Sequence, residues 1–213
     1  MSESDDDVPT LSAEALKALN EFYHEQEEER NKLERVQNNL KDCDISAFQE
    51  NWQLSQFWYD NSTIEALTSE ICKICKENGR IALISCPSLY KSLKSKAKNR
   101  EVILFEYDKR FAMYGLDYNF YDYNFPLDVP RELAGYFDVV VADPPFLSED
   151  CITKTSVTIK FFTKSKIILC TGAVMEELVG KLLSLKKSSF EPKHENNLAN
   201  EFCCYTNYNN SFK

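Results

Sequence analysis

The chain has 213 residues, of which 43% are hydrophobic and 28% are charged, so it can bury the core of one domain and need not be disordered. It has no apolar run of the roughly 18 residues that a membrane span needs, and it opens with acidic and polar residues in place of a basic, apolar leader. We therefore expect neither membrane insertion nor secretion.

The acidic residues are concentrated at the start of the chain. Eleven of the 34 acidic residues but only three of the 25 basic ones fall in the first 34 positions, so this segment holds nearly all of the net charge of -9. Proteins that bind nucleic acids normally present a basic surface to the phosphates, and neither part of this chain supplies a strong one. The acidic segment suits a basic protein partner, or solubility alone.

The eight cysteines are scattered, and several lie in apolar runs where a reduced cysteine packs as a small hydrophobic residue. This pattern predicts a reducing compartment and hence a cytoplasmic location. The pair Cys72-x-x-Cys75 lacks two further ligands at a suitable spacing for zinc, so we expect no metal site.

The acidic segment predicts one helix and a linker. Ser12 can cap an amphipathic helix, while residues 25–35 are almost entirely charged and polar and residues 36–47 resemble a linker. The apolar residues of that helix recur at spacings of three and four, at Ala15, Leu16, Leu19, Phe22 and Tyr23. We expect residues 1–46 to form an acidic N-terminal extension and residues 47–213 to form the main domain.

Aromatic residues are dense in the next segment, 48–59, which contains both tryptophans of the chain and should therefore pack or bind. A helix is predicted from Ser62 or Thr63 to Cys75. A strand is expected directly afterwards, at Arg80–Ser85.

The rest of the chain alternates helical patterns with apolar runs of strand length. The helices are expected at 89–97, within 148–163 and at 175–185. The strands are expected at 102–107, 118–121, 137–142 and 166–170, followed by an antiparallel pair near 189–193 and 202–207.

This alternation predicts an α/β fold with a mostly parallel, doubly wound sheet that is covered on both faces. The final antiparallel pair completes an order similar to the seven-stranded, Rossmann-like fold of class I S-adenosylmethionine-dependent methyltransferases. Ligands of such sheets bind outside the carboxyl ends of the strands, so the residues that follow each strand are the candidates for function.

The sharpest motif is Asp143-Pro144-Pro145-Phe146, which directly follows the apolar run Asp138–Ala142. The two prolines make the loop rigid, so that it presents the Asp143 carboxylate and nearby carbonyl groups as acceptors, with Phe146 as an apolar wall. Acceptors of this kind hold the N–H groups of an amine and aim its lone pair at an electrophile. The motif matches the signature [DNSH]-P-P-[FYW] of methyltransferases that act on exocyclic or side-chain nitrogens.

A methyl donor should be held by residues that follow the earlier strands. Glu106 and Asp108 end the second strand, and either could accept hydrogen bonds from ribose hydroxyl groups. Asp122 follows the third strand and is placed to bind the adenine amine, with Tyr123 or a neighbour on the face of the ring.

The first strand lacks the glycine-rich turn that usually follows it in such folds. The chain reads Ser85-Cys86-Pro87-Ser88 there, and without glycine the backbone should not approach a donor in the usual way. We expect that the donor is held differently, with Ser85 and Pro87 beside it and with the segment around Gln56 and Trp58 folding over it.

From about Leu11 to Tyr208 the sequence resembles the eukaryotic elongation factor 1-alpha lysine methyltransferases, a family first described as adenine-specific DNA methyltransferases. The resemblance rests on five blocks, at 50–59, 105–115, 142–149, 169–173 and 197–202. The family also carries Ser-x-Pro-Ser after its first strand, which implies that the missing glycines do not mark an inactive enzyme.

The resemblance implies methyl transfer from S-adenosylmethionine to a lysine of translation elongation factor 1-alpha. Two alternatives stay open from the residues alone. One is an adenine-specific nucleic-acid methyltransferase, because the same tetrapeptide can hold an adenine amine and Phe146 could stack on a flipped base. The other is a methyltransferase-like binding module without catalysis.

Overall fold

The computed structural model describes residues 16, 17, 20, 49–196, 200–209 and 212. By its internal contacts the chain divides between Cys43 and Asp44. In the first unit Leu16, Lys17 and Asn20 are helical, and the rest of the expected N-terminal helix and linker lies outside the described residues.

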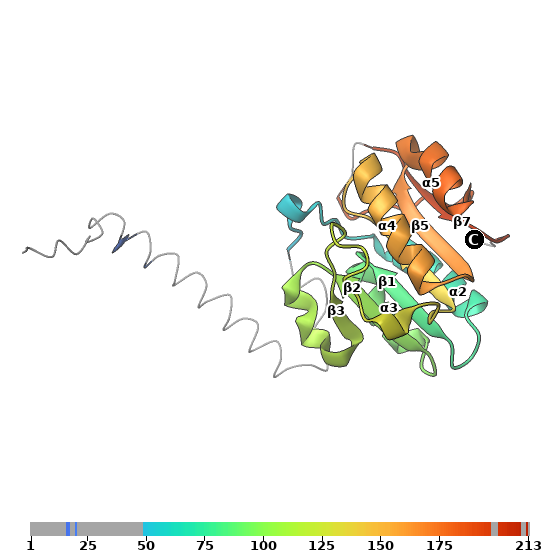
Figure 1. The fold of residues 1–213 in the computed structure, drawn as a ribbon, viewed down its shortest axis with the longest axis horizontal. Coiled ribbons are helices and arrows are strands. Elements are labelled where there is room, and N and C mark those ends of the chain that lie inside the picture. Colours follow the sequence, from blue (N-terminus) through green and yellow to red (C-terminus); the bar gives the residue numbers. More distant parts are fainter. Residues whose placement is uncertain (1–15, 18–19, 21–48, 197–199, 210–211, 213) are drawn as a thin grey trace, which may run out of the picture. The chain divides into compact units, whose positions relative to one another are not determined.

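The second unit is built on a seven-stranded sheet with the order β3-β2-β1-β4-β5-β7-β6 (Figure 1). The first five strands pair in parallel, whereas β7 runs antiparallel to both β5 and β6. The strands are β1 (Arg80–Ile84), β2 (Glu101–Glu106), β3 (Tyr118–Phe120), β4 (Val139–Ala142), β5 (Lys166–Gly172), β6 (Lys186–Lys187) and β7 (Phe202–Thr206). The predicted α/β fold, with its antiparallel C-terminal pair, is confirmed.

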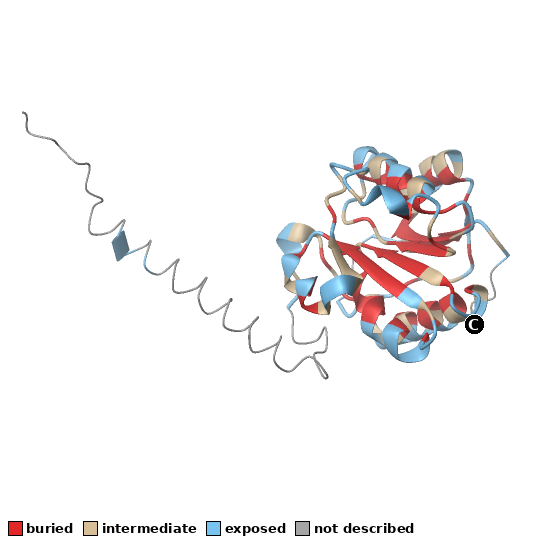
Figure 2. Cartoon of the chain, turned by 60° about the horizontal axis from the view of Figure 1, so that its bottom comes forward, coloured by how far each residue is buried: buried red, intermediate tan, exposed pale blue. Residues whose placement is uncertain are grey.

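Two pairs of helices cover the two faces of the sheet (Figure 2). The helices are α2 (Asn61–Ile74), α3 (Tyr90–Lys96), α4 (Glu149–Phe162) and α5 (Glu176–Leu183). α2 and α3 pack in one core cluster with Leu83 and Val141, while α4 and α5 pack in another with Ile84 and Val140. Neighbouring residues of each strand thus point to opposite cores, which is why the strands read as continuous apolar runs.

Polar side chains set where the helices begin. Asp60 accepts a hydrogen bond from the Thr63 backbone N–H at 2.7 Å, so α2 starts at Asn61, slightly before the expected position. Ser148 caps α4 in the same way through the backbone N–H of Cys151 at 3.2 Å. Short 3₁₀ turns connect the larger elements: η2 (Trp52–Leu54), η3 (Pro87–Leu89), η4 (Lys109–Asp117), η5 (Arg131–Leu133) and η6 (Ala173–Met175).

The expected strand at 189–193 is wrong, and the strand that pairs with β7 is Lys186–Lys187. Pro192 has no N–H to donate to a sheet. The backbone of Lys193 bonds elsewhere: its N–H donates to the Thr63 hydroxyl at 2.8 Å and its carbonyl accepts from the Asp60 N–H at 3.0 Å. This segment therefore binds to the start of α2 and not to the sheet.

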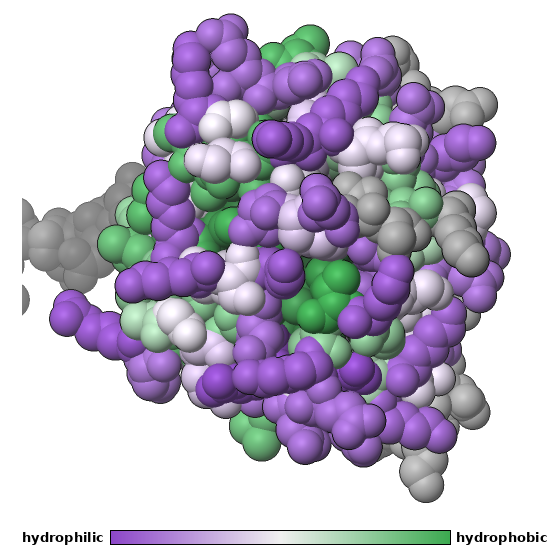
Figure 3. Space-filling model, turned by 90° about the vertical axis from the view of Figure 1, so that its right-hand side faces the viewer, coloured by the Kyte–Doolittle hydropathy of each residue, from purple (hydrophilic) through white to green (hydrophobic). Residues whose placement is uncertain are grey.

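The face of the molecule seen in Figure 3 is largely hydrophilic, with small apolar patches between the polar side chains. In the described part of the chain, every helix is too short or too polar to cross a bilayer.

Candidate active site

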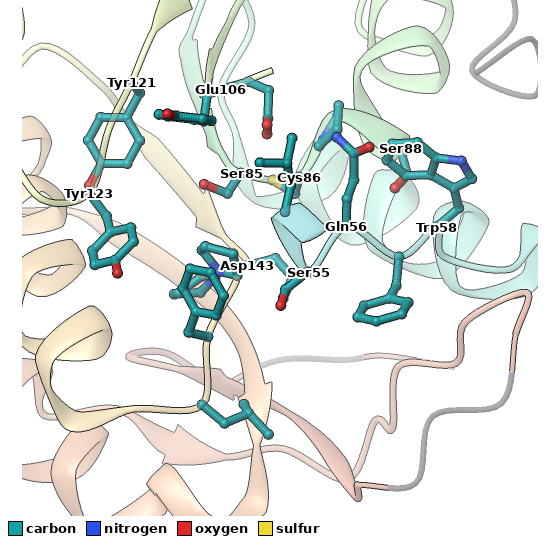
Figure 4. Close-up of a pocket in the computed structure, with 18 of the residues that line it drawn as sticks. Ser55, Gln56, Trp58, Ser85, Cys86, Ser88, Glu106, Tyr121, Tyr123 and Asp143 are labelled. Atoms are coloured by element: carbon teal, nitrogen blue, oxygen red, sulfur yellow. The ribbon is translucent and has the colours of Figure 1, made fainter. Parts of the chain in front are cut away.

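A cavity of about 540 Å³ opens where β1, β2 and β4 end, at the carboxyl edge of the parallel strands. Figure 4 shows Gln56 and Trp58 on one side of it, Tyr121 and Tyr123 on the other, and Asp143 between them. Eleven of the twelve predicted site residues line this cavity: Gln56, Trp58, Ser85, Pro87, Glu106, Asp122, Tyr123, Asp143, Pro144, Pro145 and Phe146. Asp108 is the exception.

The loop after β4 is anchored to the sheet at its first residue. The Asp143 backbone N–H donates to the Ile84 carbonyl at 3.0 Å, which ties the loop to the end of β1. Pro144 is buried, whereas Phe146 is 38% exposed and packs edge-on against Tyr123 with ring centroids 5.8 Å apart. The loop thus combines a fixed carboxylate with a more open aromatic wall.

Burial raises the pKa of Asp143 to about 7, and the nearby Tyr59 hydroxyl opposes this rise. Tyr59 is 1% exposed, and within the described residues its hydroxyl makes no hydrogen bond of ordinary geometry. Few interactions offset the cost of burying the charge of the Asp143 carboxylate. The site therefore favours a cationic ligand, because a positive charge beside the carboxylate stabilises its ionised form.

The turn after β1 does adopt a backbone conformation that normally favours glycine. Ser85 has a φ of 54°, in the left-handed region, and its N–H is held by the Phe105 carbonyl at 2.9 Å. Such a conformation costs a non-glycine residue about 1 kcal/mol or more, and strain of this kind gathers at functional sites. The absence of glycine therefore does not prevent a left-handed backbone conformation at this position. Pro87 then opens the 3₁₀ turn η3.

The structure separates the two acids at the end of β2. Glu106 lines the cavity, is 7% exposed, and has its pKa raised to about 7, mainly by burial. Asp108 lies outside the cavity lining, and its carboxylate is held by the Arg110 side chain at 2.7 and 2.8 Å and by Gln56 Nε2 at 3.1 Å. Burial disfavours the charge of Asp108, but the bonds from Arg110 and Gln56 outweigh it and lower its pKa.

Asp108 instead helps to fix the aromatic segment that lines the cavity. Gln56 donates to Asp108, and its own carbonyl oxygen accepts from Arg110 Nη2 at 2.9 Å. Glu50 adds a second anchor, because its carboxylate accepts the Trp58 backbone N–H at 2.8 Å and Asn196 Nδ2 at 2.7 Å. The segment that the sequence marked only by its aromatic density is thus held by polar bonds at both ends.

Carboxyl groups are the source of charge in the described wall of the cavity. Three carboxyl groups line it, from Glu106, Asp122 and Asp143, whereas the described residues in its wall include neither lysine nor arginine. Asp122 also accepts the backbone N–H of Asn124 at 2.8 Å and its side chain at 3.0 Å, which shapes the loop after β3. The cavity therefore suits a ligand with positive charge.

Several lining residues were not among the predicted ones. Cys86 and Ser88 belong to the turn after β1, so their position relative to that strand could have identified them. His194 and Phe202 come from the C-terminal segments and carry no local signal. The His194 ring packs between Tyr59 and Phe202, at centroid distances of 5.0 and 4.8 Å, and burial lowers its pKa.

The described cysteines, seven of the eight, are all free thiols. The described residues contain no cluster of three or more His, Cys, Asp or Glu side chains that could bind a metal ion.

Comparisons with known proteins agree with this geometry. Residues 50–210 match the family model described as "Probable N6-adenine methyltransferase". The chain is 52% identical over 206 residues to human "EEF1A lysine methyltransferase 1", covering 96% of this chain and 94% of that protein. It is 39% identical to "Protein-lysine N-methyltransferase EFM5" of Saccharomyces cerevisiae, covering 93% and 92%.

Among solved structures, a "putative RNA methyltransferase" of Pyrococcus horikoshii matches with a TM-score of 0.51 and 13% identity, covering 82% of this chain and 94% of that one. At this identity the likeness concerns the fold alone, and it supports the methyltransferase fold that the strand order predicts.

Proposed function

Since the chain belongs to the family of EEF1A lysine methyltransferases, we propose that its cavity binds S-adenosylmethionine beside a lysine side chain of translation elongation factor 1-alpha. The chain is a protein-lysine N-methyltransferase. The observation that carries the assignment of the site is the Asp143 loop, which follows β4 and lies in a cavity lined by three carboxyl groups and, among its described residues, by no basic side chain.

The residues present fit the donor. A volume of about 540 Å³ lies in the range of small-molecule sites. Glu106 ends β2, and its buried carboxyl group lines the cavity, where it accepts the Asp108 backbone N–H at 3.1 Å and would accept ribose hydroxyl groups as well. We propose that Glu106 holds the ribose, and that Asp122 and Tyr123 contact the adenine.

The aromatic segment and the turn after β1 complete the donor site in this proposal. Ser85 and Pro87 lie beside the donor in this proposal, and the segment with Gln56 and Trp58 folds over it. Asp108 acts indirectly, because it holds Gln56 together with Arg110. When bound, S-adenosylmethionine supplies an electrophilic methyl group on a cationic sulfur.

The Asp143 loop would handle the amine. Methyl transfer requires a neutral lysine amine, whose ordinary pKa is about 10.4. The Asp143 carboxylate favours the charged ammonium, so its role is to orient the nitrogen through N–H hydrogen bonds and not to deprotonate it. Phe146 shields the amine from water and thereby favours its neutral form.

The alternative of an adenine-specific nucleic-acid methyltransferase keeps one supporting observation, the description of the matching family model. The charge pattern disfavours it, because the cavity lacks basic residues in its described wall and the chain has a net charge of -9. We further propose a cytoplasmic location, since the free thiols agree with a reducing compartment.

The decisive experiment measures methyl transfer from labelled S-adenosylmethionine into purified elongation factor 1-alpha, beside DNA and RNA. Wild type, Asp143→Ala and a control, Glu132→Ala, which removes an exposed carboxylate outside the cavity, are assayed in parallel. We expect the protein to be labelled by wild type and control, and the label to be lost with Asp143→Ala. Label in a nucleic acid would instead support the alternative.

A further inference from the structure

Apolar side chains lie exposed on both sides of the cavity mouth. On one side Trp52 is 72% exposed and packs on the cavity-lining Phe57 with ring centroids 6.1 Å apart. On the other side the cavity-lining Phe146 is 38% exposed, and Phe125 (63% exposed) and Leu127 (57% exposed) follow the cavity-lining Asn124 in the chain. We call these five apolar residues the rim. Exposed apolar side chains gathered around a functional cavity mark an interaction site more often than scattered ones do.

The Trp52 side of the rim is rigid without help from its apolar groups. η2 is capped by Asn51, whose side chain accepts the Gln53 backbone N–H at 3.1 Å. Gln56 then ties the segment to Asp108. Since these polar bonds set the course of the backbone, the exposed Trp52 ring is not needed to hold the loop and is free for contact with a partner.

The Phe125 side is held in a similar way. The Phe125 N–H donates to the Asp122 carbonyl at 2.9 Å, and the Phe125 carbonyl accepts the Asp128 N–H at 2.9 Å. The Thr158 hydroxyl of α4 donates to the Pro126 carbonyl at 2.8 Å. Phe125 and Leu127 therefore stand on a turn that is fixed to the body of the domain.

The chemistry between the two sides indicates what docks there. The cavity that they flank is lined by carboxyl groups and, in its described wall, by no cation, so it accepts a positively charged side chain. We propose that the rim is the docking surface for the protein substrate, and that it binds a segment whose target lysine is flanked by apolar side chains. This inference rests on the proposed function and adds to it the surface that recognises the substrate.

Large aromatic groups on such surfaces carry a disproportionate share of binding energy. Two substitutions test the rim, Trp52→Ala and Phe125→Ala. The matched control is Leu116→Ala. Leu116 is 98% exposed but precedes β3, so it lies toward the amino-terminal ends of the parallel strands, whereas the cavity lies at their carboxyl ends. All three side chains are largely exposed, and thermal melts check that each variant remains folded.

Initial rates are measured against the concentration of elongation factor 1-alpha, and affinity for S-adenosylhomocysteine is measured by calorimetry. We expect each rim substitution to raise KM for the protein about tenfold, while kcat and the Kd for S-adenosylhomocysteine change less than about twofold. The control should leave all three constants unchanged.

Other outcomes overturn the proposal. An unchanged KM in both rim variants would show that the substrate docks elsewhere. Loss of S-adenosylhomocysteine affinity would mean that the rim serves the donor, and a change of sedimentation from dimer to monomer would identify a second copy of the chain as its occupant. If the wild type labels no protein although it binds S-adenosylhomocysteine, the proposed function fails first and the rim proposal fails with it.

Discussion

The buried carboxyl group of Glu106 predicts that donor binding depends on pH. In the free protein burial raises its pKa to about 7, and the nearby Asp108 charge adds to this. Ribose hydroxyl groups that donate to the carboxylate favour its ionised form, so binding should lower the pKa and release a proton. Affinity should therefore increase as the pH rises through 7.

The size of the effect follows from the fraction of ionised Glu106. With a pKa of about 7, about one molecule in eleven carries the carboxylate at pH 6, and about ten in eleven at pH 8. If only the ionised form binds well, the apparent Kd is the intrinsic Kd divided by that fraction. The Kd should then be about tenfold weaker at pH 6 than at pH 8.

Calorimetry with S-adenosylhomocysteine is the appropriate assay, because this product lacks the positive sulfur that would couple to the other cavity acids. Asp143 also has a pKa of about 7 and lines the same cavity, so the titration is done in wild type and in Asp143→Asn. Glu106→Gln is the matched variant, since it keeps the size of the side chain and removes its titration.

We expect a similar pH dependence in wild type and Asp143→Asn, and a nearly constant Kd in Glu106→Gln. Titrations in buffers of different ionisation enthalpy should count about half a proton released at pH 7 by wild type. An equal Kd at pH 6 and pH 8 in wild type, or an unchanged slope in Glu106→Gln, would refute the assignment of Glu106 to the ribose.

Three further substitutions probe the packing around the site. Arg110→Ala should lower the free energy of unfolding, measured by urea unfolding at pH 7, by about 3 kcal/mol, because it leaves the buried Asp108 carboxylate without its charged partner. The loss should become smaller as the pH falls. The ion pair stabilises the fold only while Asp108 is ionised, and this stabilisation is lost as the pH falls through the lowered pKa of Asp108. Gly172→Ala should reduce kcat severalfold in the methylation assay at little cost in melting temperature, because the added Cβ would lie 2.9 Å from the tip of Leu147, a flexible side chain that lines the cavity and would be displaced. Tyr59→Phe should raise the pH at which activity is half-maximal in a pH–rate profile, because the Tyr59 hydroxyl opposes the raised pKa of Asp143 and its removal leaves that pKa higher.

Where the structural signal is local, the amino-acid sequence predicts the elements correctly. The apolar runs of β1, β2, β4 and β5 were found because a strand buried on both faces must be apolar at every position. The strand at 189–193 was wrong, because its backbone partners come from the start of α2, which lies far away in the sequence. Backbone hydrogen bonds to partners so far away in the sequence do not produce a periodic pattern of side chains in a short segment.

Local sequence patterns and long-range contacts also determine different parts of the candidate site. The sequence by itself determined the parallel sheet and the position of Asp143 after β4, because strand order places such residues at one edge. Only the tertiary structure distinguishes the surroundings of Glu106 and Asp108, because it places one carboxyl group in the cavity wall and pairs the other with Arg110. It also brought His194 into the cavity wall, since long-range packing and not local pattern sets which side chains surround a ligand.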